Sequence, residues 1–316
     1  MATFSVVIPL YNRPKEIDEL LATLAAQSYK DFDVVVIEDG SYLRGEQECH
    51  RWAQHLHLRY EYTPNQGPAK ARNLGVSLCT GEYILFFDSD CLIPPRYMEM
   101  ANRFITATPN CALWGGPDAA HPSFSPVQKA ISYAMTSPFS TGGIRGGSET
   151  ADKFYPRTFN MGVRRDAFNA IGGFSNMRYG EDVDFSMRIV EAGYHSQLCR
   201  ELFVFHKRRT SLRQFFTQVQ HSGRARVALS RKHKGTLRPV HVLPAIGAVL
   251  AAFALTTLWR TFSLAMAMAA TLYCLIVLIH ATATLKSFRL GWLAMMACCV
   301  QLVGYGTGFL KGLFCH

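Results

Sequence analysis

Two short acidic motifs in the sequence contain residue types that could do chemistry. In the first, Asp88 and Asp90 flank one serine directly after the apolar run at residues 83–87. Two carboxylates at a strand end suit a hard divalent cation, which takes oxygen ligands and completes its shell with substrate phosphates. Acidic residues in turns are also common for capping reasons, so this motif alone leaves a structural interpretation open.

The second motif is the pair Glu181 and Asp182, which follows Tyr179-Gly180 at the start of an expected helix. Acidic side chains are favoured in a first helical turn because they complement the helix dipole. A carboxylate held near an acceptor hydroxyl could also act as a general base and take its proton during a transfer. Both interpretations stay open from this motif alone.

Four further side chains could bind a metal ion or an anion. His206 ends the apolar run LFVF, where an imidazole could complete a metal site or play a structural part. Lys70, Arg72 and Asn73 lie in the helical pattern at residues 68–78, where cations and an amide could meet phosphates. Lys and Arg on helices are mostly solvated, so their residue types do not decide between the two interpretations.

The elements that must position these residues alternate between strand and helix. Apolar runs of strand type cover residues 4–10, 32–37, 59–62 and 83–87, and helical patterns lie between them. This alternation predicts an α/β fold with a mostly parallel sheet and helices on both faces. Ligands bind beyond the carboxyl ends of the strands in such sheets. Three polar clusters follow those ends: Tyr11-Asn12, Glu38-Asp39 and Asp88-Ser89-Asp90.

A long segment at residues 115–158 lacks the periodic pattern of a helix or strand. It is rich in Gly, Pro and Ser. A segment of this kind is either a disordered connection or a binding loop that orders over substrate. We expect acceptor choice to depend on residues 117–158 within it.

Positive charge is concentrated in one part of the chain. The 316 residues include 33 Lys and Arg against 23 Asp and Glu, which gives a net charge of +10 and a pI of about 9.2. Residues 1–199 carry a net charge of −4 and residues 200–239 carry +10, while residues 240–316 contain no acid. A nucleic-acid-binding protein would need basic charge on its folded domain, so we expect no nucleic-acid partner.

The C-terminal part has the length and composition of membrane-spanning segments. Stretches free of Asp, Glu, Lys and Arg cover residues 240–258, 261–285 and 290–310. The first has 19 residues, which extend about 28 Å as a helix, near the thickness of the hydrocarbon core. We expect three transmembrane helices, preceded by a basic amphipathic segment at residues 207–239 whose apolar face contacts lipid or packs on the folded domain.

The positive charges also predict an orientation. The basic segment before residue 240, together with Lys286 and Arg289, outweighs the lone Arg260 of the first loop. By the positive-inside rule this places the folded domain on the cytoplasmic side of the inner membrane and the C-terminus outside. The localisation expected is therefore a multi-pass protein of the inner membrane.

Six motifs in chain order carry a family resemblance. They read SVVIPLYNRP, VVVIEDGS, NQGPAKARNLG, YILFFDSDC, NMGVRRDAFNAIGGF and GEDVDFSMR. This series resembles the family 2 glycosyltransferases, inverting enzymes of the GT-A fold that use nucleotide-diphospho-sugars. The resemblance covers about residues 4–206 and implies a Rossmann-like sheet of mostly parallel, mixed strands.

The resemblance implies a role for each matching residue. On the donor side it implies contacts from Pro9, Tyr11, Asn12, Glu38, Asp39, Lys70, Arg72, Asn73 and Asp88. Asp90 matches the direct ligand of Mn²⁺ or Mg²⁺, and His206 and Asp88 match further residues of the metal site. Asp182 matches the catalytic base, with Glu181 and Asn160 on the acceptor side.

The organisation and function expected follow from these parts. A GT-A catalytic domain at residues 1–206 precedes the juxtamembrane segment 207–239 and the transmembrane region 240–316. The chain is expected to move a sugar from a nucleotide-diphospho-sugar to a hydroxyl of a lipid-linked or cell-envelope glycan, with residues 207–316 bound to membrane lipids. The alternatives are a polyprenyl-phosphate glycosyltransferase and a non-catalytic nucleotide-sugar-binding membrane scaffold. The paired carboxylates argue against the scaffold, because a binding module needs no base.

Overall fold

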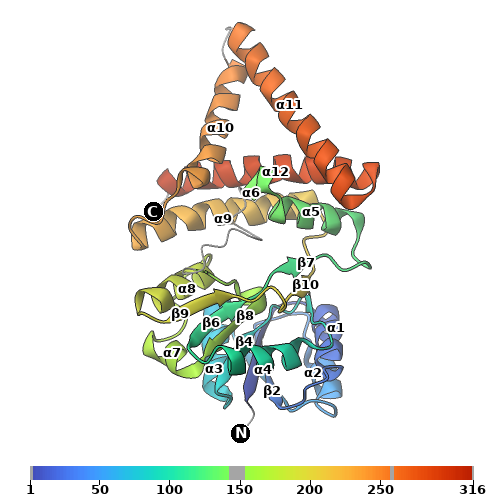
Figure 1. Ribbon diagram of the computed structural model, residues 1–316, viewed down its shortest axis with the longest axis vertical. Coiled ribbons are helices and arrows are strands. Elements are labelled where there is room, and N and C mark those ends of the chain that lie inside the picture. Colours follow the sequence, from blue (N-terminus) through green and yellow to red (C-terminus); the bar gives the residue numbers. More distant parts are fainter. Residues whose placement is uncertain (1–2, 142–153, 257–259, 315–316) are drawn as a thin grey trace. The chain divides into compact units, whose positions relative to one another are not determined.

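The chain forms two compact units. The structure, a computed structural model, describes residues 3–141, 154–256 and 260–314 (Figure 1). The first unit comprises Met1–His121 and Glu149–Lys207, and the second comprises Pro122–Ser148 and Arg208–His316. The boundary at residue 207 lies beside the end of the expected catalytic domain, whereas residues 122–148 group with the second unit. Residues 142–153 of the expected acceptor loop lie outside the described residues.

The first unit alternates strands and helices along most of its length. Its elements are β1 (Phe4–Leu10), α1 (Pro14–Ala25), β2 (Phe32–Asp39), α2 (Glu46–Trp52), β3 (Leu58–Thr63), α3 (Pro68–Leu78), β4 (Tyr83–Phe86), β5 (Cys91–Leu92), α4 (Tyr97–Ala107), β6 (Cys111–Gly115), β7 (Asp118–Ala119), the 3₁₀ turn η1 (Thr158–Asn160), β8 (Met161–Arg164), α7 (Arg165–Ala170), α8 (Glu181–Glu191), β9 (His195–Leu198) and β10 (Val204–His206).

The strands of the first unit form two sheets. The larger has seven strands in the order β3-β2-β1-β4-β8-β6-β9, and the smaller has the order β5-β10-β7. Strands β3, β2, β1 and β4 are parallel to one another, whereas β8 runs antiparallel to both β4 and β6. The predicted α/β class with a mostly parallel, mixed sheet is confirmed.

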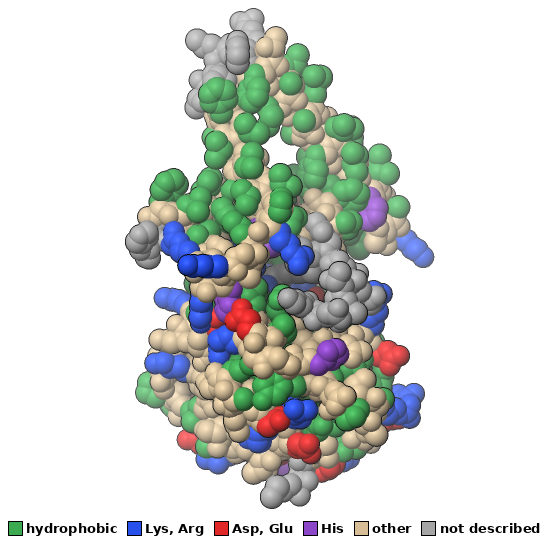
Figure 2. Space-filling view, turned by 60° about the vertical axis from the view of Figure 1, so that its left-hand side comes forward, with side chains coloured by type: hydrophobic (Ala, Val, Ile, Leu, Met, Phe, Trp, Pro, Cys, Tyr) green, Lys and Arg blue, Asp and Glu red, His purple; other side chains and the backbone are tan. Residues whose placement is uncertain are grey.

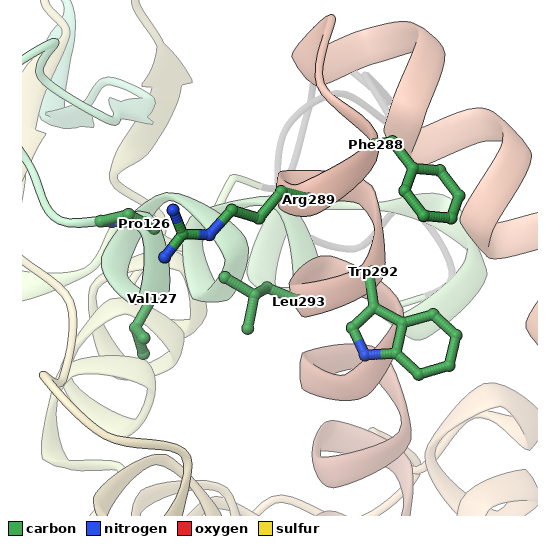
Figure 3. A pocket seen from close by; sticks show the side chains of 6 residues that line it. All are labelled: Pro126, Val127, Phe288, Arg289, Trp292 and Leu293. Carbon is green, nitrogen blue, oxygen red and sulfur yellow. The ribbon is translucent and has the colours of Figure 1, made fainter.

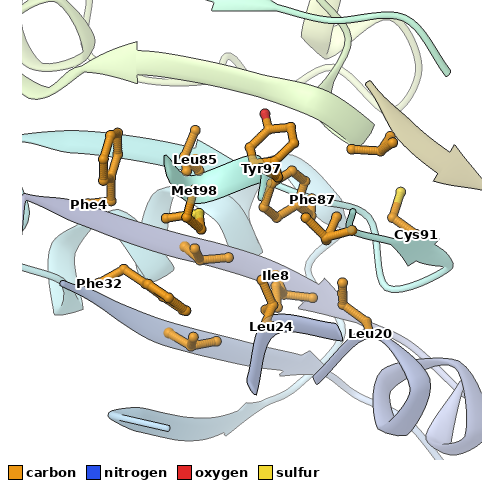
Figure 4. Packing of buried hydrophobic residues seen from close by; sticks show 14 of the residues in the cluster. Phe4, Ile8, Leu20, Leu24, Phe32, Leu85, Phe87, Cys91, Tyr97 and Met98 are labelled. Atoms are coloured by element: carbon orange, nitrogen blue, oxygen red, sulfur yellow. The ribbon is translucent and has the colours of Figure 1, made fainter. Parts of the chain in front are cut away.

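The large sheet is buried on both faces, which explains why its central strands are apolar at successive positions. In β1, Val6 and Ile8 lie in one hydrophobic cluster and Val7 lies in another. Figure 4 shows the first cluster, where Ile8 packs beside Leu24 of α1 and near Phe87, which follows β4. A parallel sheet covered on both faces needs such continuous apolar strands.

The second unit is helical. Its elements are α5 (Pro126–Thr136), α6 (Pro138–Thr141), α9 (Leu212–Lys232), α10 (Pro239–Thr256), α11 (Arg260–Leu285) and α12 (Phe288–Phe314). In the part of the chain that the structure describes, two helices have the length and composition of membrane spans, Thr261–Leu285 and Phe288–Phe314. The stretch expected as the first span contains a shorter apolar helix, Pro239–Ala254. Figure 2 shows hydrophobic side chains across the visible surface of α10 and α11.

The apolar face of α9 has a protein partner. Phe215 and Val219 of α9 are buried in one cluster with Ala294, Ala297 and Cys298 of α12. The expectation that this face contacts lipid or the folded domain is therefore corrected, because α12 occupies it.

Candidate active site

The polar clusters predicted from the sequence lie at one edge of the large sheet. Strands β1, β2 and β3 are paired in parallel, and Leu10 at the end of β1 pairs with Glu38, which in turn pairs with Tyr62 of β3. Strand β4 pairs in parallel with β1 and ends two residues before Asp88. Because parallel strands bring their carboxyl ends to the same edge, residues far apart in the chain can act at one place.

Arg72 connects helix α3, on which it lies, to two other segments of the first unit. Its guanidinium is almost fully buried and contacts Asp88 Oδ1 through Nη2 at 2.8 Å and Glu181 Oε1 through Nη1 at 3.0 Å. These contacts hold helix α3 to the loop after β4 and to the start of α8. A buried charge of this kind is tolerated because carboxylates on both sides compensate it.

The buried arginine and its partners influence one another's ionisation. Burial alone would lower the pKa of Arg72, but the charges of Asp88 and Glu181 raise it, so the guanidinium stays charged. Burial raises the pKa of Glu181, and the neighbouring charge of Asp182 raises it further against the opposing effect of Arg72.

Asp90 and His206 meet because the small sheet sets them side by side. Strands β5 and β10 are antiparallel with Cys91 opposite His206, and the amide of Lys207 donates to the carbonyl of Asp90 at 2.9 Å. His206 Nε2 lies 3.2 Å from Asp90 Oδ1. The other carboxylate oxygen of Asp90 accepts a hydrogen bond from Arg13. Arg13 and His206, which are far apart in the sequence, thus contact the same carboxylate, that of Asp90.

This pair fits a divalent cation. Asp90 Oδ1 is buried and accepts no hydrogen bond from the described residues, which leaves a lone pair available for an ion beside the imidazole. Burial would raise the pKa of Asp90, but the charges of His206 and Arg13 outweigh that effect and hold the pKa below its ordinary value. The carboxylate is therefore ionised, and oxygen and imidazole ligands suit Mn²⁺.

Two neighbouring residues are less suited to hold the ion. Cys91 lies within the same group, where one candidate ligand atom from each residue lies within 4.8 Å of the others. Burial raises the pKa of its thiol well above the ordinary value, and Sγ–H faces the carbonyl of Phe159 at 3.4 Å. Asp88, a further candidate, has its carboxylate bound to Arg72.

Asp182 is the partly exposed acid of the first turn of α8. The helix begins after Gly180, whose φ of +81° is a left-handed conformation that glycine adopts without strain. Asp182 Oδ1 accepts hydrogen bonds from Arg157 Nη1 at 3.1 Å and from the amide of Val183 at 2.7 Å. The helix therefore fixes this carboxylate at the same edge of the sheet as the Arg72 contacts.

Asp184, two residues along the same helix, has a structural role. Its carboxylate is fully buried and accepts hydrogen bonds from Ser175 at 2.6 Å and Arg188 at 3.0 Å. Two acids of this turn thus differ: Asp182 is partly exposed, and Asp184 is bonded internally.

The donor-side candidates on β1 and β2 hold their own loops in place. Asn12 has a φ of +54°, and its Oδ1 accepts hydrogen bonds from the amides of Tyr42 at 2.9 Å and Leu43 at 3.0 Å. Next to it, Tyr11 is half exposed and Pro9 is partly buried. Pro9, Tyr11 and Asn12 therefore lie at the carboxyl end of β1, at the edge of the sheet where the other polar clusters lie.

The two acids at the end of β2 are both hydrogen-bonded. Asp39 accepts from the amides of Gln66 at 2.7 Å and Gly67 at 2.8 Å, immediately before α3. Glu38 is buried and accepts from the hydroxyl of Tyr60 and from the amide of Gly45 at 3.1 Å. These contacts fix the loops around the sheet edge.

The remaining predicted residues, Lys70, Asn73 and Asn160, differ in their exposure and in their hydrogen-bond partners. Lys70 is exposed on α3, whereas Asn73 exchanges two hydrogen bonds of 2.9 Å with the backbone of Phe174. Asn160, expected on the acceptor side, is fully buried and bonds to the hydroxyl of Tyr97 and the carbonyl of Leu202, each at 2.6 Å. Its amide is therefore hydrogen-bonded within the interior of the first unit.

Sequence reasoning missed Arg13 and Arg157, which contact Asp90 and Asp182. Arg13 directly follows the polar cluster Tyr11-Asn12, and this position in the sequence could have indicated that it belongs to the site. Arg157 lies in the Gly- and Ser-rich segment, where no periodic pattern indicates a direction. Both positions depend on contacts across the fold that spacing does not encode.

A separate hollow lies in the second unit. It has a volume of about 630 Å³ and is lined by Pro126 and Val127 of α5 and by Phe288, Arg289, Trp292 and Leu293 of α12 (Figure 3). None of the candidate catalytic residues lies among those that line it.

The mixed sheet, with acidic side chains gathered at one edge, has the architecture of the GT-A class. Residues 5–172 match the model of glycosyl transferase family 2, and residues 149–314 match that of glycosyl transferase family 21. The chain belongs to glycosyl transferase family 2, and it is a glycosyltransferase.

Curated relatives share parts of the chain. An uncharacterized glycosyltransferase of Rickettsia felis is 36% identical over 101 residues, which cover 32% of this chain and 17% of the relative. The poly(ribitol-phosphate) beta-N-acetylglucosaminyltransferase TarS of Staphylococcus aureus is 38% identical over 109 residues, covering 33% and 19%. The pre-mycofactocin glycosyltransferase of Mycobacterium tuberculosis is 27% identical over 251 residues, covering 75% and 49%. The chain thus spans less than a fifth of the first two and about half of the third.

Solved structures confirm the expected GT-A fold. The mannosyltransferase PcManGT from Pyrobaculum calidifontis, solved in complex with GDP-Man and Mn²⁺, has a TM-score of 0.66 at 19% identity and covers 99% of this chain and 87% of its own. TarS 1–349 from S. aureus has a TM-score of 0.52 at 20% identity, covering 98% and 90%.

Proposed function

We propose that the chain is a metal-dependent, inverting glycosyltransferase that takes a sugar from a nucleotide-diphospho-sugar and passes it to a hydroxyl of a lipid-linked or cell-envelope glycan. It acts at the cytoplasmic side of the inner membrane, anchored through residues 207–316. The observation that carries the proposal is the contact of Arg72 with both Asp88 and Glu181, which connects the donor-side loop to the turn that bears Asp182.

The donor is held by charges at the sheet edge. Asp90 and His206 would hold Mn²⁺ or Mg²⁺, and such an ion neutralises the charge of a diphosphate leaving group. Arg13 lies against the same carboxylate, so a fixed positive charge is already present beside the place for the phosphates. PcManGT, with a similar fold, was solved with a nucleotide-sugar and Mn²⁺, which supports this arrangement.

Asp182 acts as the base. Its carboxylate accepts the proton of the acceptor hydroxyl as the oxygen attacks the anomeric carbon on the face opposite the diphosphate, and the configuration inverts. Arg157 orients this carboxylate through its hydrogen bond at 3.1 Å. Glu181 has a raised pKa and is bound to Arg72, which gives it a positioning role beside the base.

The substitution Asp182→Asn tests this assignment. It keeps the shape of the side chain but removes the proton acceptor, so we expect transfer to fall by roughly two orders of magnitude or more while donor affinity changes little. Nucleotide release from the detergent-purified protein across a donor panel, with and without Mn²⁺ and lipid extract, gives the rate, and calorimetry gives donor affinity.

Glu191→Gln, at the other end of α8, is the matched control and should keep full activity. Near-normal turnover of Asp182→Asn would exclude Asp182 as the base. If transfer to a polyprenyl phosphate persists in that variant while transfer to hydroxyl acceptors stops, the acceptor is the phosphate, since it is already an anion. A wild-type protein that binds donor without turnover on any acceptor would support the scaffold instead.

A further inference from the structure

The two units differ completely in their acidic residues. All 23 Asp and Glu residues lie in the first unit, and the second contains none, against 15 Lys and Arg. The second unit also exposes large apolar side chains on α11, such as Leu264, Leu272 and Ile279, with exposures of 61%, 59% and 69%. A surface that is both acid-free and apolar complements an anionic lipid bilayer.

Within the second unit, α9 lies along α12 over much of its length. A Cβ added at Gly304 would lie 2.5 Å from Val219, and one at Gly308 would lie 2.0 Å from the carbonyl oxygen of Gln220. Near the far end, Arg231 donates to the carbonyl of Leu313 at 3.0 Å. Small residues allow this close approach of two helix backbones, and Figure 1 shows the two helices side by side.

The other helices of the unit also contact α12. Helix α5 packs on it through Ala130 and Ala134, which share a buried cluster with Ala294 and Cys298. Helices α10 and α11 rise from it at two places and converge at their far ends (Figure 1). These contact points are 15 residues apart on α12: Gly306 meets the carbonyl of Pro244, and Gly291 meets Thr282.

Short linkers fix the side of the membrane on which α5 and α9 lie. Four residues, 208–211, separate the first unit from α9, and four others, 122–125, separate it from α5. Four extended residues reach about 14 Å, which is less than half the hydrocarbon thickness. Chain length therefore holds the starts of both helices on the side of the first unit, and α5, with 11 residues, is also too short to cross the bilayer.

We propose that α5, α9 and α12 form a layer that lies along the membrane surface on the side of the first unit, and that only the hairpin of α10 and α11 enters the hydrocarbon. This inference rests on the membrane anchoring of the proposed function and replaces the three spans expected from the sequence. Its consequence is that the C-terminal end of α12 stays on the side of the first unit.

The charges of α9 exclude a third span. Arg213, Arg224, Arg231 and Lys232 are exposed on this helix. If α12 crossed the bilayer, α9 would have to lie beside it within the hydrocarbon, where each exposed charge is expensive. Along the surface the same charges meet anionic headgroups, while Trp292 and Phe288 of α12 are exposed to the lipid. Helix α11, with 26 residues and about 39 Å, is long enough for the hairpin to reach the far headgroups.

Reporter fusions after His316 of the full chain test the position of α12. Green fluorescent protein folds in the cytoplasm, and alkaline phosphatase is active only outside it. We expect the fusion to green fluorescent protein to be fluorescent and the fusion to alkaline phosphatase to show only background phosphatase activity. As a control, one added apolar span of about 20 residues before each reporter must reverse the pattern.

Each outcome separates this inference from the proposed function. Membrane-retained protein with active phosphatase overturns the surface position of α12 and leaves the anchored enzyme intact. Release of the protein by alkaline carbonate refutes the anchoring itself. Neither readout depends on sugar transfer, so a failure of the catalytic assignment does not affect them.

The contact between α9 and α12 has its own test. Gly308→Leu should separate the helices and increase trypsin cleavage at Arg224 and Arg231 by at least about threefold, because there is no space for a side chain against Gln220. Val303→Leu, at an exposed position of α12, is the matched control and should leave the cleavage rate unchanged. Equal cleavage in both variants would contradict the packing on which the inference depends.

Discussion

At the scale of single residues, the site depends on carboxylates that are shared between two partners each. Asp90 lies between Arg13 and His206, and Glu181 lies between Arg72 and the neighbouring Asp182. Because Arg13 compensates Asp90 and Arg72 compensates Glu181, the loss of either arginine leaves a carboxylate without its cation. Substitutions here should therefore alter ionisation and ligand binding and also lower stability.

His206→Ala should weaken Mn²⁺ binding. It removes the imidazole beside Asp90 Oδ1, and we expect the Mn²⁺-dependent affinity for nucleotide to fall at least about tenfold. Isothermal titration with and without Mn²⁺ measures the effect independently of turnover. His195→Ala, an exposed histidine of the same unit, is the control. Equal Mn²⁺ affinity in both variants would remove His206 from the metal site.

Glu181 should give the stability of the protein a defined pH dependence. Its pKa is raised above 4.5 by burial and by Asp182, so the folded state binds the proton more tightly than the unfolded state does. The stability it contributes is fully present below pH 4.5 and is lost as pH rises through the raised pKa. The Tm of Glu181→Gln relative to wild type should therefore increase with pH across this window.

Thermal unfolding in detergent from pH 4.5 to pH 8 measures this difference. Glu99→Gln is the control, because hydrogen bonds from Arg96 and Ser28 lower the pKa of Glu99 and confine its effect to lower pH. A Tm difference for Glu181→Gln that stays constant with pH would refute the ionisation assigned to Glu181.

At the scale of elements, close packing between strands fixes the geometry of the sheet edge. Gly162 of β8 lies against the indole of Trp114 on β6, where an added Cβ would come within 2.0 Å of the ring. The strand that follows η1 can therefore sit beside β6 only with glycine at this position.

Gly162→Ala should destabilise the first unit by about 1–3 kcal/mol, because overpacking forces the ring or the strand to move. Thermal or urea unfolding measures the change. Gly247→Ala on α10, where an added Cβ meets no atom within 4 Å, is the control and should be neutral or slightly stabilising. An unchanged stability of Gly162→Ala would show that Trp114 can shift freely.

The alternation of elements and the polar strand ends were predictable from the sequence because they follow from local periodicity. The apolar runs that became β1, β2 and β4 are short and bounded, and parallel pairing then places Asn12, Asp39 and Asp88 at one edge. Contacts such as that of Arg157 with Asp182 were not predictable, since side-chain direction in an aperiodic loop depends on the whole fold. The inward position of Asn160 was hidden for the same reason.

At the scale of the whole molecule, hydropathy alone predicted the wrong kind of partner for α9. Its apolar positions read correctly as one face, but nothing local distinguishes a face that contacts lipid from one that contacts another helix. The glycines of α12 were visible as a sign of close contact. Their partners, α9 at Gly304 and Gly308 and α10 at Gly306, follow only from the three-dimensional arrangement.

The separation of acids from the second unit also changes what acidity can do to the protein. Between about pH 3 and pH 5 the aspartates and glutamates take up protons, and all of them lie in the first unit. Mild acid therefore removes the negative charges of the catalytic half, while the 15 Lys and Arg of the anchoring half stay charged. The isoelectric point of 9.2 is thus an average that describes neither half. Salt, which screens the fixed charges, should weaken the contact of α9 with anionic headgroups, and acid should govern the chemistry.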